Sequence, residues 1–262
     1  MEYVIVAVAA AVASGLTMYS GFGLGTILLP VFALFVPVEW AVAATAVVHA
    51  ANNVLKVSLL GKLADRDVVI RFGAPAVLAA FLGAWLLAVV AEIPGSVSWQ
   101  LAGVQGEITA INAVIGVLML GFAVFELSPR FAGVELDARW LPVGGVLSGF
   151  FGGLSGHQGA LRSAFLASTR ITAKAFVGTN AVIGLAVDLI RIGVYGVLVF
   201  GADVSVLLGG ASGNLVLVGT LAAFAGVLVG RRYLNKVTMD GVRRLTGGML
   251  LVIAVLLIAG VV

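Results

Sequence analysis

Tyr3–Val38 reads YVIVAVAAAVASGLTMYSGFGLGTILLPVFALFVPV and contains no charged residue. A straight helix of this length would measure about 50 Å at 1.5 Å per residue, whereas the hydrocarbon core of a bilayer is about 30 Å thick. Gly21, Gly23 and Gly25 interrupt the middle of the stretch. Because glycine lets the backbone leave a helix, we expect the segment to enter the membrane, break and return to the same side. Strong tilt of one long helix is the alternative.

The composition of the whole chain agrees with a membrane protein. Of its 262 residues, 61% are hydrophobic and only 10% are charged, whereas a soluble domain is about a quarter charged. Phe72–Ala91, Val204–Gly230 and Leu245–Val262 are further charge-free runs. The sequence therefore predicts an all-α polytopic membrane protein. Its apolar segments are expected at about 2–36, 39–60, 68–91, 108–126, 140–169, 172–200, 204–230 and 242–262.

The chain has no cysteine and a net charge of +3. The absence of cysteine excludes disulfides, thiolate metal sites and iron–sulfur clusters. A modest basic excess in a membrane protein reports orientation rather than nucleic-acid binding. We expect no cofactor, no metal and no nucleic acid, and we leave homo-oligomerisation open.

The basic residues predict how the chain is oriented. The loops at 60–71 and 231–244 are rich in Lys and Arg. In the loops at 92–107 and 201–203, the charged residues are all acidic: Glu92, Glu107 and Asp203. Basic loops face the cytoplasm, but eight single crossings would place the two basic loops on opposite sides. If segments 2–36 and 140–169 are both hairpins, every basic loop becomes cytoplasmic and both termini lie outside.

An internal repeat is suggested by a shift of 134 residues. This shift places Ser14 on Ser148, Gly15 on Gly149, Gly25 on Gly159 and Thr45 on Thr179. Two-fold repeats are typical of secondary transporters. We therefore expect two inverted repeats of about four segments each, at 1–128 and 135–262, within one membrane domain.

The glycine-rich breaks are the first candidate site. Residues 20–26 read SGFGLGT, and residues 152–159 read GGLSGHQG. Backbone that leaves a helix inside the membrane is tolerated where it lines a polar cavity, and a restarting helix offers N–H groups to an anion. Close helix packing is the alternative role for these glycines. The predicted substrate-binding residues of the breaks are Ser20, Gly21, Gly23, Gly25, Thr26, Ser155, His157, Gln158 and Gly159.

Polar residues within the apolar helices extend this candidate site. His49, Asn52, Asn53 and Lys56 share one helix face. Of these, we assign His49 and Asn53 to the substrate and interpret Lys56 as a flank near the cytoplasm; helix–helix hydrogen bonding is the alternative for the asparagines.

The second half of the chain adds its own embedded groups. Arg162 is either an anion ligand, a partner of Asp188 or a snorkelling side chain. Asn180 is a further substrate ligand. Asp188 is expected to pair with Arg191 three residues later, with a role as coupling residue as the alternative.

Taken together, these features resemble the TauE/SafE family of anion exporters. The resemblance rests on Ser14-Gly15 with Gly21–Gly25 and Pro30, and on the run from Ser148 to Gly159, each followed by a helix that bears Thr and Asn. It implies a secondary transporter in the bacterial or archaeal inner membrane. The implied substrate is sulfite or an organosulfonate such as sulfoacetate, exported by alternating access.

Two other functions remain as alternatives. Gly153-Leu154-Ser155-Gly156 fits the pattern of intramembrane serine hydrolases. A serine nucleophile needs an adjacent base, and the chain has only two histidines, of which His157 alone follows Ser155. An anion channel is the third reading, although paired repeats favour alternating access.

Overall fold

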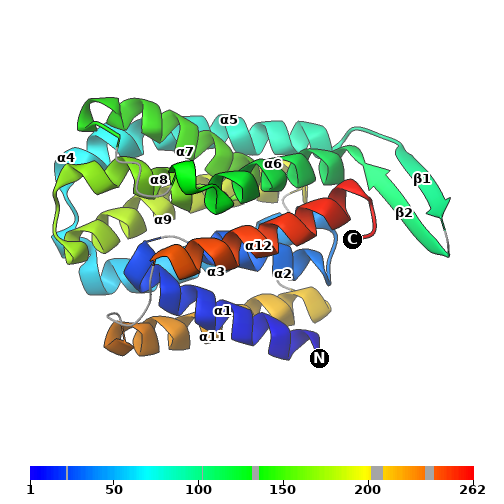
Figure 1. The fold of residues 1–262 in the computed structure, drawn as a ribbon, viewed down its shortest axis with the longest axis horizontal. Helices are drawn as coiled ribbons and strands as arrows, with labels where there is room; N and C mark the ends of the chain where they lie inside the picture. The colour runs from blue at the N-terminus through cyan, green and yellow to red at the C-terminus, as the bar shows by residue number, and fades with distance from the viewer. Residues whose placement is uncertain (22, 102, 132–135, 202–208, 234–238) are drawn as a thin grey trace.

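Almost every element of the computed structural model is a helix, and the long helices run side by side (Figure 1). The structure describes residues 1–262 except 22, 102, 132–135, 202–208 and 234–238. The helices are α1 (Glu2–Ser20), α2 (Leu24–Ala33), α3 (Val38–Leu60), α4 (Arg66–Val68), α5 (Ala74–Ala91), α6 (Ala110–Leu127), α7 (Leu141–Ser155), α8 (Gly159–Leu166), α9 (Ala173–Leu198), α11 (Gly210–Tyr233) and α12 (Met239–Ile258). Short 3-10 helices are η1 (Gly61–Leu63), η3 (Pro129–Phe131), η4 (Ala138–Trp140) and η5 (Ala167–Thr169), and η2 (Val69–Gly73) is a π-helix that joins α4 to α5.

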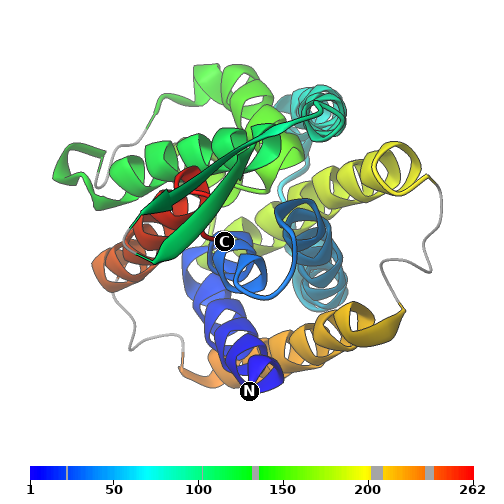
Figure 2. The same cartoon turned by 90° about the vertical axis from the view of Figure 1, so that its right-hand side faces the viewer.

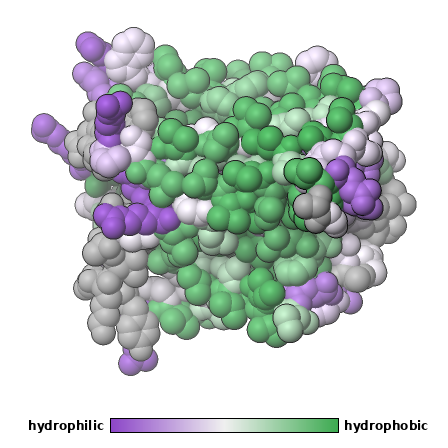
Figure 3. Space-filling view, turned by 45° about the vertical axis from the view of Figure 1, so that its right-hand side comes forward, coloured by the Kyte–Doolittle hydropathy of each residue, from purple (hydrophilic) through white to green (hydrophobic). Residues whose placement is uncertain are grey.

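Several helices are long and apolar enough to cross a bilayer. Among the described residues there are five such spans, Val38–Leu63, Arg66–Ala91, Ala110–Leu127, Ala173–Leu198 and Ser212–Gly230. Their outer faces are apolar: Leu78, Leu82 and Trp85 of α5 are each about half exposed or more, at 72%, 56% and 49%. Figure 3 shows an apolar belt with polar residues at both ends. An apolar band of this kind matches a lipid environment, so the prediction of an all-α multi-pass membrane protein is confirmed.

Both long apolar segments are broken at the predicted glycines. α1 ends at Ser20 and α2 begins at Leu24, while α7 ends at Ser155 and α8 begins at Gly159. In each pair the second helix runs back toward the end from which the first one came (Figures 1 and 2). The chain therefore folds back on itself twice, instead of forming two strongly tilted long helices.

The fold-backs place the charged residues at opposite ends of the molecule. One end, at the left of Figure 1, holds η1, α4, the C-terminal ends of α6, α8 and α11, and the N-terminal ends of α7, α9 and α12. The other end holds both chain termini, the connection between α2 and α3, and the segment between α5 and α6. Segments at the first end carry Lys62, Arg66, Arg71, Arg130, Arg139, Arg170, Lys174, Arg231, Arg232, Arg243 and Arg244. Described segments at the other end carry Glu2, Glu39, Glu92 and Glu107 and no Lys or Arg.

The segment expected as a loop at 92–107 contains a β-hairpin. Strands β1 (Ser96–Leu101) and β2 (Val104–Thr109) pair antiparallel, with Ser96 opposite Thr109. The indole Nε1 of Trp99 donates to the backbone oxygen of Ala259, 2.7 Å away, and so ties the hairpin to the C-terminal end of α12. Alternating Val97, Trp99 and Leu101 were the sequence signal for a strand.

Two helix pairs meet with almost no side chain between them. A Cβ on Gly149 of α7 would lie 2.0 Å from the backbone oxygen of Ala76 on α5, and one on Gly226 of α11 would lie 2.2 Å from the backbone oxygen of Ala11 on α1. Only glycine fits at such contacts. Small residues of this kind let membrane helices approach closely, and here they attach the first arm of each fold-back to a full-length helix.

Single cysteines test this arrangement, because the native chain has none. Ser98→Cys lies on the exposed hairpin, and Lys62→Cys lies at the basic end. We expect a membrane-impermeant maleimide to label Ser98→Cys in intact spheroplasts, but to label Lys62→Cys only after the membrane is permeabilised, because basic ends face the cytoplasm. Equal labelling of both positions before permeabilisation would contradict the fold-back topology.

Candidate functional site

The two helix breaks meet inside the molecule. Gly21 and Gly23 bound the first break with φ of 74° and 119°, and Gly156 ends α7 with φ of 81°. These left-handed conformations favour glycine, since other residues lose about 1–2 kcal/mol there. A Cβ on Gly25 would lie 3.2 Å from the backbone oxygen of Gly156, so the first turn of α2 rests against the second break. Gly25 and Thr26 are buried beside this contact.

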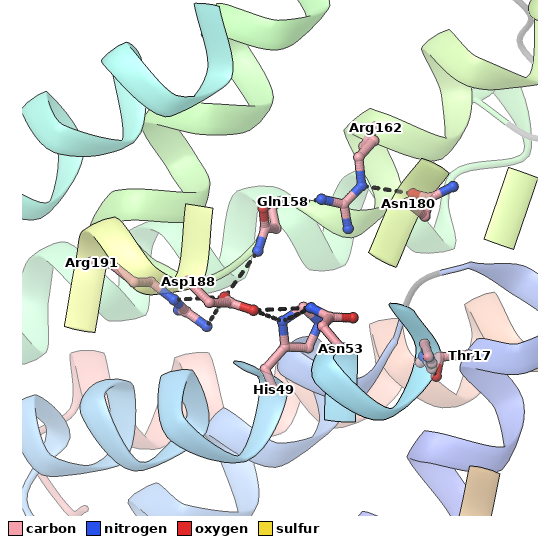
Figure 4. Close-up of polar contacts among 9 residues, drawn as sticks. Thr17, His49, Asn53, Gln158, Arg162, Asn180, Asp188 and Arg191 are labelled. Carbon is pink, nitrogen blue, oxygen red and sulfur yellow. Dashed lines mark hydrogen bonds and ion pairs between the residues drawn. The ribbon is translucent and has the colours of Figure 1, made fainter. Parts of the chain in front are cut away.

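A buried carboxylate next to the breaks has hydrogen-bond partners from three segments of the chain (Figure 4). Asp188 of α9 is 0% exposed. Its Oδ2 lies 2.6 Å from His49 Nδ1 and accepts from Asn53 Nδ2 at 3.0 Å, both on α3. Its Oδ1 accepts from Arg191 Nε at 3.0 Å and from Gln158 Nε2 at 3.3 Å. The carboxylate therefore joins α3, α9 and the second break through charge-assisted hydrogen bonds.

Arg162 lies beside this group but pairs with no carboxylate among the described residues. The guanidinium is 2% exposed. Its Nε donates to Asn180 Oδ1 at 2.6 Å, and its Nη1 donates to Gln158 Oε1 at 3.2 Å. The side chain is therefore embedded and does not snorkel to the surface, and amides rather than Asp188 supply its direct hydrogen bonds.

Lys56 is also buried, contrary to its interpretation as a flank near the cytoplasm. Its side chain is 4% exposed, and its ammonium donates to the hydroxyl of Thr17 on α1. A small cavity lies against Lys56, Thr17, Gly21, His49, Asn53 and Asn180, with room for about one water molecule. The polar residues of α3 therefore have two kinds of contact. The Oδ1 of Asn52 accepts from the Ser14 hydroxyl of α1 at 2.7 Å, whereas His49, Asn53 and Lys56 line the cavity.

The charges of this centre do not cancel. The centre contains three cationic side chains, those of Lys56, Arg162 and Arg191. Among the described residues, Asp188 is the single carboxylate of the centre, and it pairs with Arg191. Burial of unpaired charge is expensive, and ionisable groups within a membrane usually mark a functional path. The chemistry offered here is that of an anion-binding site, with amide and hydroxyl donors around an excess of positive charge.

Seven of the predicted site residues come together in this centre: Gly21, His49, Asn53, Gln158, Arg162, Asn180 and Asp188. Ser155 and His157 do not join it. The His157 ring instead stacks on Phe122 of α6, with centroids 5.1 Å apart. The side chain of Ser20 lies outside the described residues. Thr17 and Lys56 were not among the predicted ligands, although Lys56 continued the polar spacing of α3.

The family model described as "Sulfite exporter TauE/SafE" matches residues 3–257, nearly the whole chain. The chain belongs to the TauE/SafE family. No curated protein and no solved structure gave a match. TauE/SafE proteins are membrane transporters, so this chain is a transporter and not an enzyme.

The contacts of Ser155 do not provide the arrangement that a serine nucleophile needs. Its hydroxyl donates to the backbone oxygen of Phe151 at 3.2 Å, and His157 Nδ1 lies 3.0 Å from the same hydroxyl. The backbone oxygen of Phe151 thus competes with His157 for the single hydroxyl proton of Ser155. His157 Nε2 has no hydrogen-bond partner among the described residues, so no third group orients the ring as a serine nucleophile requires.

Gly156→Ala tests the left-handed turn at the second break. The new Cβ would lie 2.5 Å from Arg191 Nη1 in a conformation that L-residues avoid. We expect a loss of about 1–2 kcal/mol or more in unfolding free energy, measured as a lower melting temperature of the purified protein in detergent. Gly193→Ala on α9 is the control, because nothing lies within 4 Å of its Cβ position. An unchanged melting temperature for Gly156→Ala would remove the conformational requirement.

Asp188→Asn tests the carboxylate as the link between three segments. Removal of its charge leaves Arg191 buried without a counter-ion, which costs about 3–5 kcal/mol in comparable buried pairs. We expect a large drop in melting temperature. Asp67→Asn is the matched control, since Asp67 pairs with Arg71 at the surface and 69% of its side chain is exposed. Equal effects of the two substitutions would show that the Asp188 network does not hold the centre together.

Proposed function

We propose that this chain exports a small oxoanion, sulfite or an organosulfonate such as sulfoacetate, across the inner membrane of a bacterium or archaeon. The observation that carries the proposal is the buried centre at the two helix breaks, where three cationic groups face one carboxylate. A bound anion offsets that excess where water is scarce. Guanidinium groups, amides and hydroxyls are the donors that oxoanions prefer.

The small size of the cavity in the centre favours alternating access over an open channel. The cavity beside Lys56 holds about one water molecule and lies among buried side chains. A sulfur oxoanion is larger than this, so the helices around the cavity have to move before a substrate enters. The glycine breaks are where the backbone has the freedom to do so.

Two repeats, 1–128 and 135–262, provide a framework for such a movement. The packing pattern supports them: the first arm of each repeat, α1 or α7, packs on a later helix of the other repeat, α11 or α5. α3 and α9 meet at the polar centre, and α6 meets α12. Exchange of partners between halves is what a two-fold relation produces.

Most predicted site residues keep their roles in this proposal, and Ser155 and His157 change theirs. Gln158, Arg162 and Asn180 bind the anion together with His49 and Asn53. The breaks supply backbone from Ser20, Gly21, Gly23 and Gly25, from Thr26, and from Gly159 at the first turn of α8. Ser155 and His157 support the second break from the side of α6, and Asp188 holds the cations in place and is the candidate coupling residue. The basic end faces the cytoplasm.

Flux in liposomes tests the proposal. Purified protein should carry sulfite, and sulfoacetate should compete with it. Arg162→Gln should lower the rate at a fixed sulfite concentration by about tenfold or more, because the guanidinium is a buried charged ligand. Gln158→Leu should act in the same direction. Arg139→Gln is the control, since 73% of the Arg139 side chain is exposed. Transport of cations or neutral sugars without any oxoanion would overturn the proposed function.

A further inference from the structure

Lys56, like Arg162, is buried in the centre without a carboxylate partner among the described residues. Its ammonium contacts the Thr17 hydroxyl, and within the described part of the chain no Asp or Glu lies at ion-pair distance from it. Lys56 of α3 is 4% exposed and points toward α1. Its ammonium therefore loses hydration without gaining an ion pair. Such an arrangement costs stability, so a structural role gives no reason to prefer lysine over an apolar residue here.

Lys56 lines the cavity, and Arg162 lies next to it, in contact with the cavity residue Asn180. Lys56, Asn53 and Asn180 line the cavity, and Asn180 accepts from Arg162 Nε. Gly184 of α9 confirms the closeness of the groups: the position of an added Cβ there lies 2.8 Å from Asn53 Nδ2 and 3.4 Å from Arg162 Nη1. The two cations are thus separated by amide groups and by the cavity, with Thr17 fixing the direction of the ammonium.

The remaining charges of the centre are already matched. Asp188 contacts Arg191 through Nε at 3.0 Å and Nη2 at 2.9 Å, so these two groups neutralise each other. His49 donates to the same carboxylate. Two positive charges, those of Lys56 and Arg162, are left without a carboxylate of their own in the part of the chain that the structure describes. One monovalent anion would balance only half of this charge.

We infer that Lys56 is a substrate-binding residue and that, together with Arg162, it makes the site selective for divalent over monovalent oxoanions. The inference rests on the proposed function and deepens it. A doubly charged anion in the cavity region accepts from Arg162 on one side and from the Lys56 ammonium on the other. A singly charged anion of the same shape leaves one cation uncompensated and binds more weakly.

Sulfate and methanesulfonate form a matched pair of probes, because both have a tetrahedral sulfur and differ by one charge. The measurement is competition by each probe against sulfite uptake in liposomes at one fixed pH. The native protein should be inhibited by sulfate at a concentration at least about tenfold lower than that needed for methanesulfonate. Lys56→Met, which keeps the length of the side chain, should weaken sulfate by about 30-fold or more, the effect of removing one partner of a buried charge pair.

The effect on methanesulfonate distinguishes charge matching from general damage. Lys56→Met should change its inhibition by about threefold or less, the range of an interaction that adds little, and Lys56→Arg should restore the preference for sulfate. Lys62→Met is the control for loss of a lysine, since Lys62 is exposed on η1. Thr17→Val provides a second route: it removes the acceptor of Lys56 and should reduce the preference for sulfate without removing the charge.

Two results would overturn the inference while leaving the proposed function intact. These are equal inhibition of the native protein by both probes, and an unchanged preference for sulfate in Lys56→Met, whether or not both probes are weakened. If the native protein carries no sulfite and neither probe binds, the proposed function itself fails. If Lys56→Met does not yield folded protein, the inference is tested with Thr17→Val instead. An unchanged preference of Thr17→Val for sulfate over methanesulfonate would contradict the role of Lys56.

Discussion

The requirement that every backbone N–H and C=O be satisfied inside lipid underlies the whole structure. Helices meet this requirement, and a break in a helix does not, unless protein surrounds it. The chain breaks twice within its apolar segments, at Gly21–Gly23 and at Gly156, and both breaks lie against each other in the interior. Burying the breaks brings α3 and α9 to the same place, and their polar faces then have no lipid contact. The site is thus a consequence of how the breaks are sheltered.

Asp188 gives this interior its order. One fully buried carboxylate accepts hydrogen bonds from α3, from α9 and from Gln158 at the second break. Without it, like charges on Arg162, Arg191 and Lys56 would face one another in a medium that screens them poorly. The carboxylate offsets one charge and directs the side chains around it, and it leaves a positive excess that suits the anion chemistry of the TauE/SafE family.

The sequence predicted the features that depend on local composition. Charge-free runs located the helices, glycine clusters located the breaks, and the distribution of Lys and Arg gave the two polar ends. Contacts between distant segments were harder. The sequence placed Lys56 at the cytoplasmic end of its helix. Its burial depends on a contact with a distant segment, because its ammonium donates to the Thr17 hydroxyl of α1. His157 adjoins Gln158 in sequence, but its ring stacks on Phe122 because neighbouring residues at a helix break point in different directions. The alternation of Val97, Trp99 and Leu101 is the signal for β1, and it is only three residues long, too short to separate a strand from a loop by periodicity.

The glycine contacts between α5 and α7, and between α1 and α11, have a mechanical consequence. Where backbones touch directly, there are no long side chains to change rotamer and absorb a displacement, so each pair behaves as one stiff rod. The short return arms α2 and α8 join those rods at the glycine turns, where the backbone direction reverses. Stiffness is therefore concentrated at the periphery and compliance at the middle of the molecule. A protein built in this way can rearrange its centre while the outline that it presents to the surrounding lipid stays nearly constant.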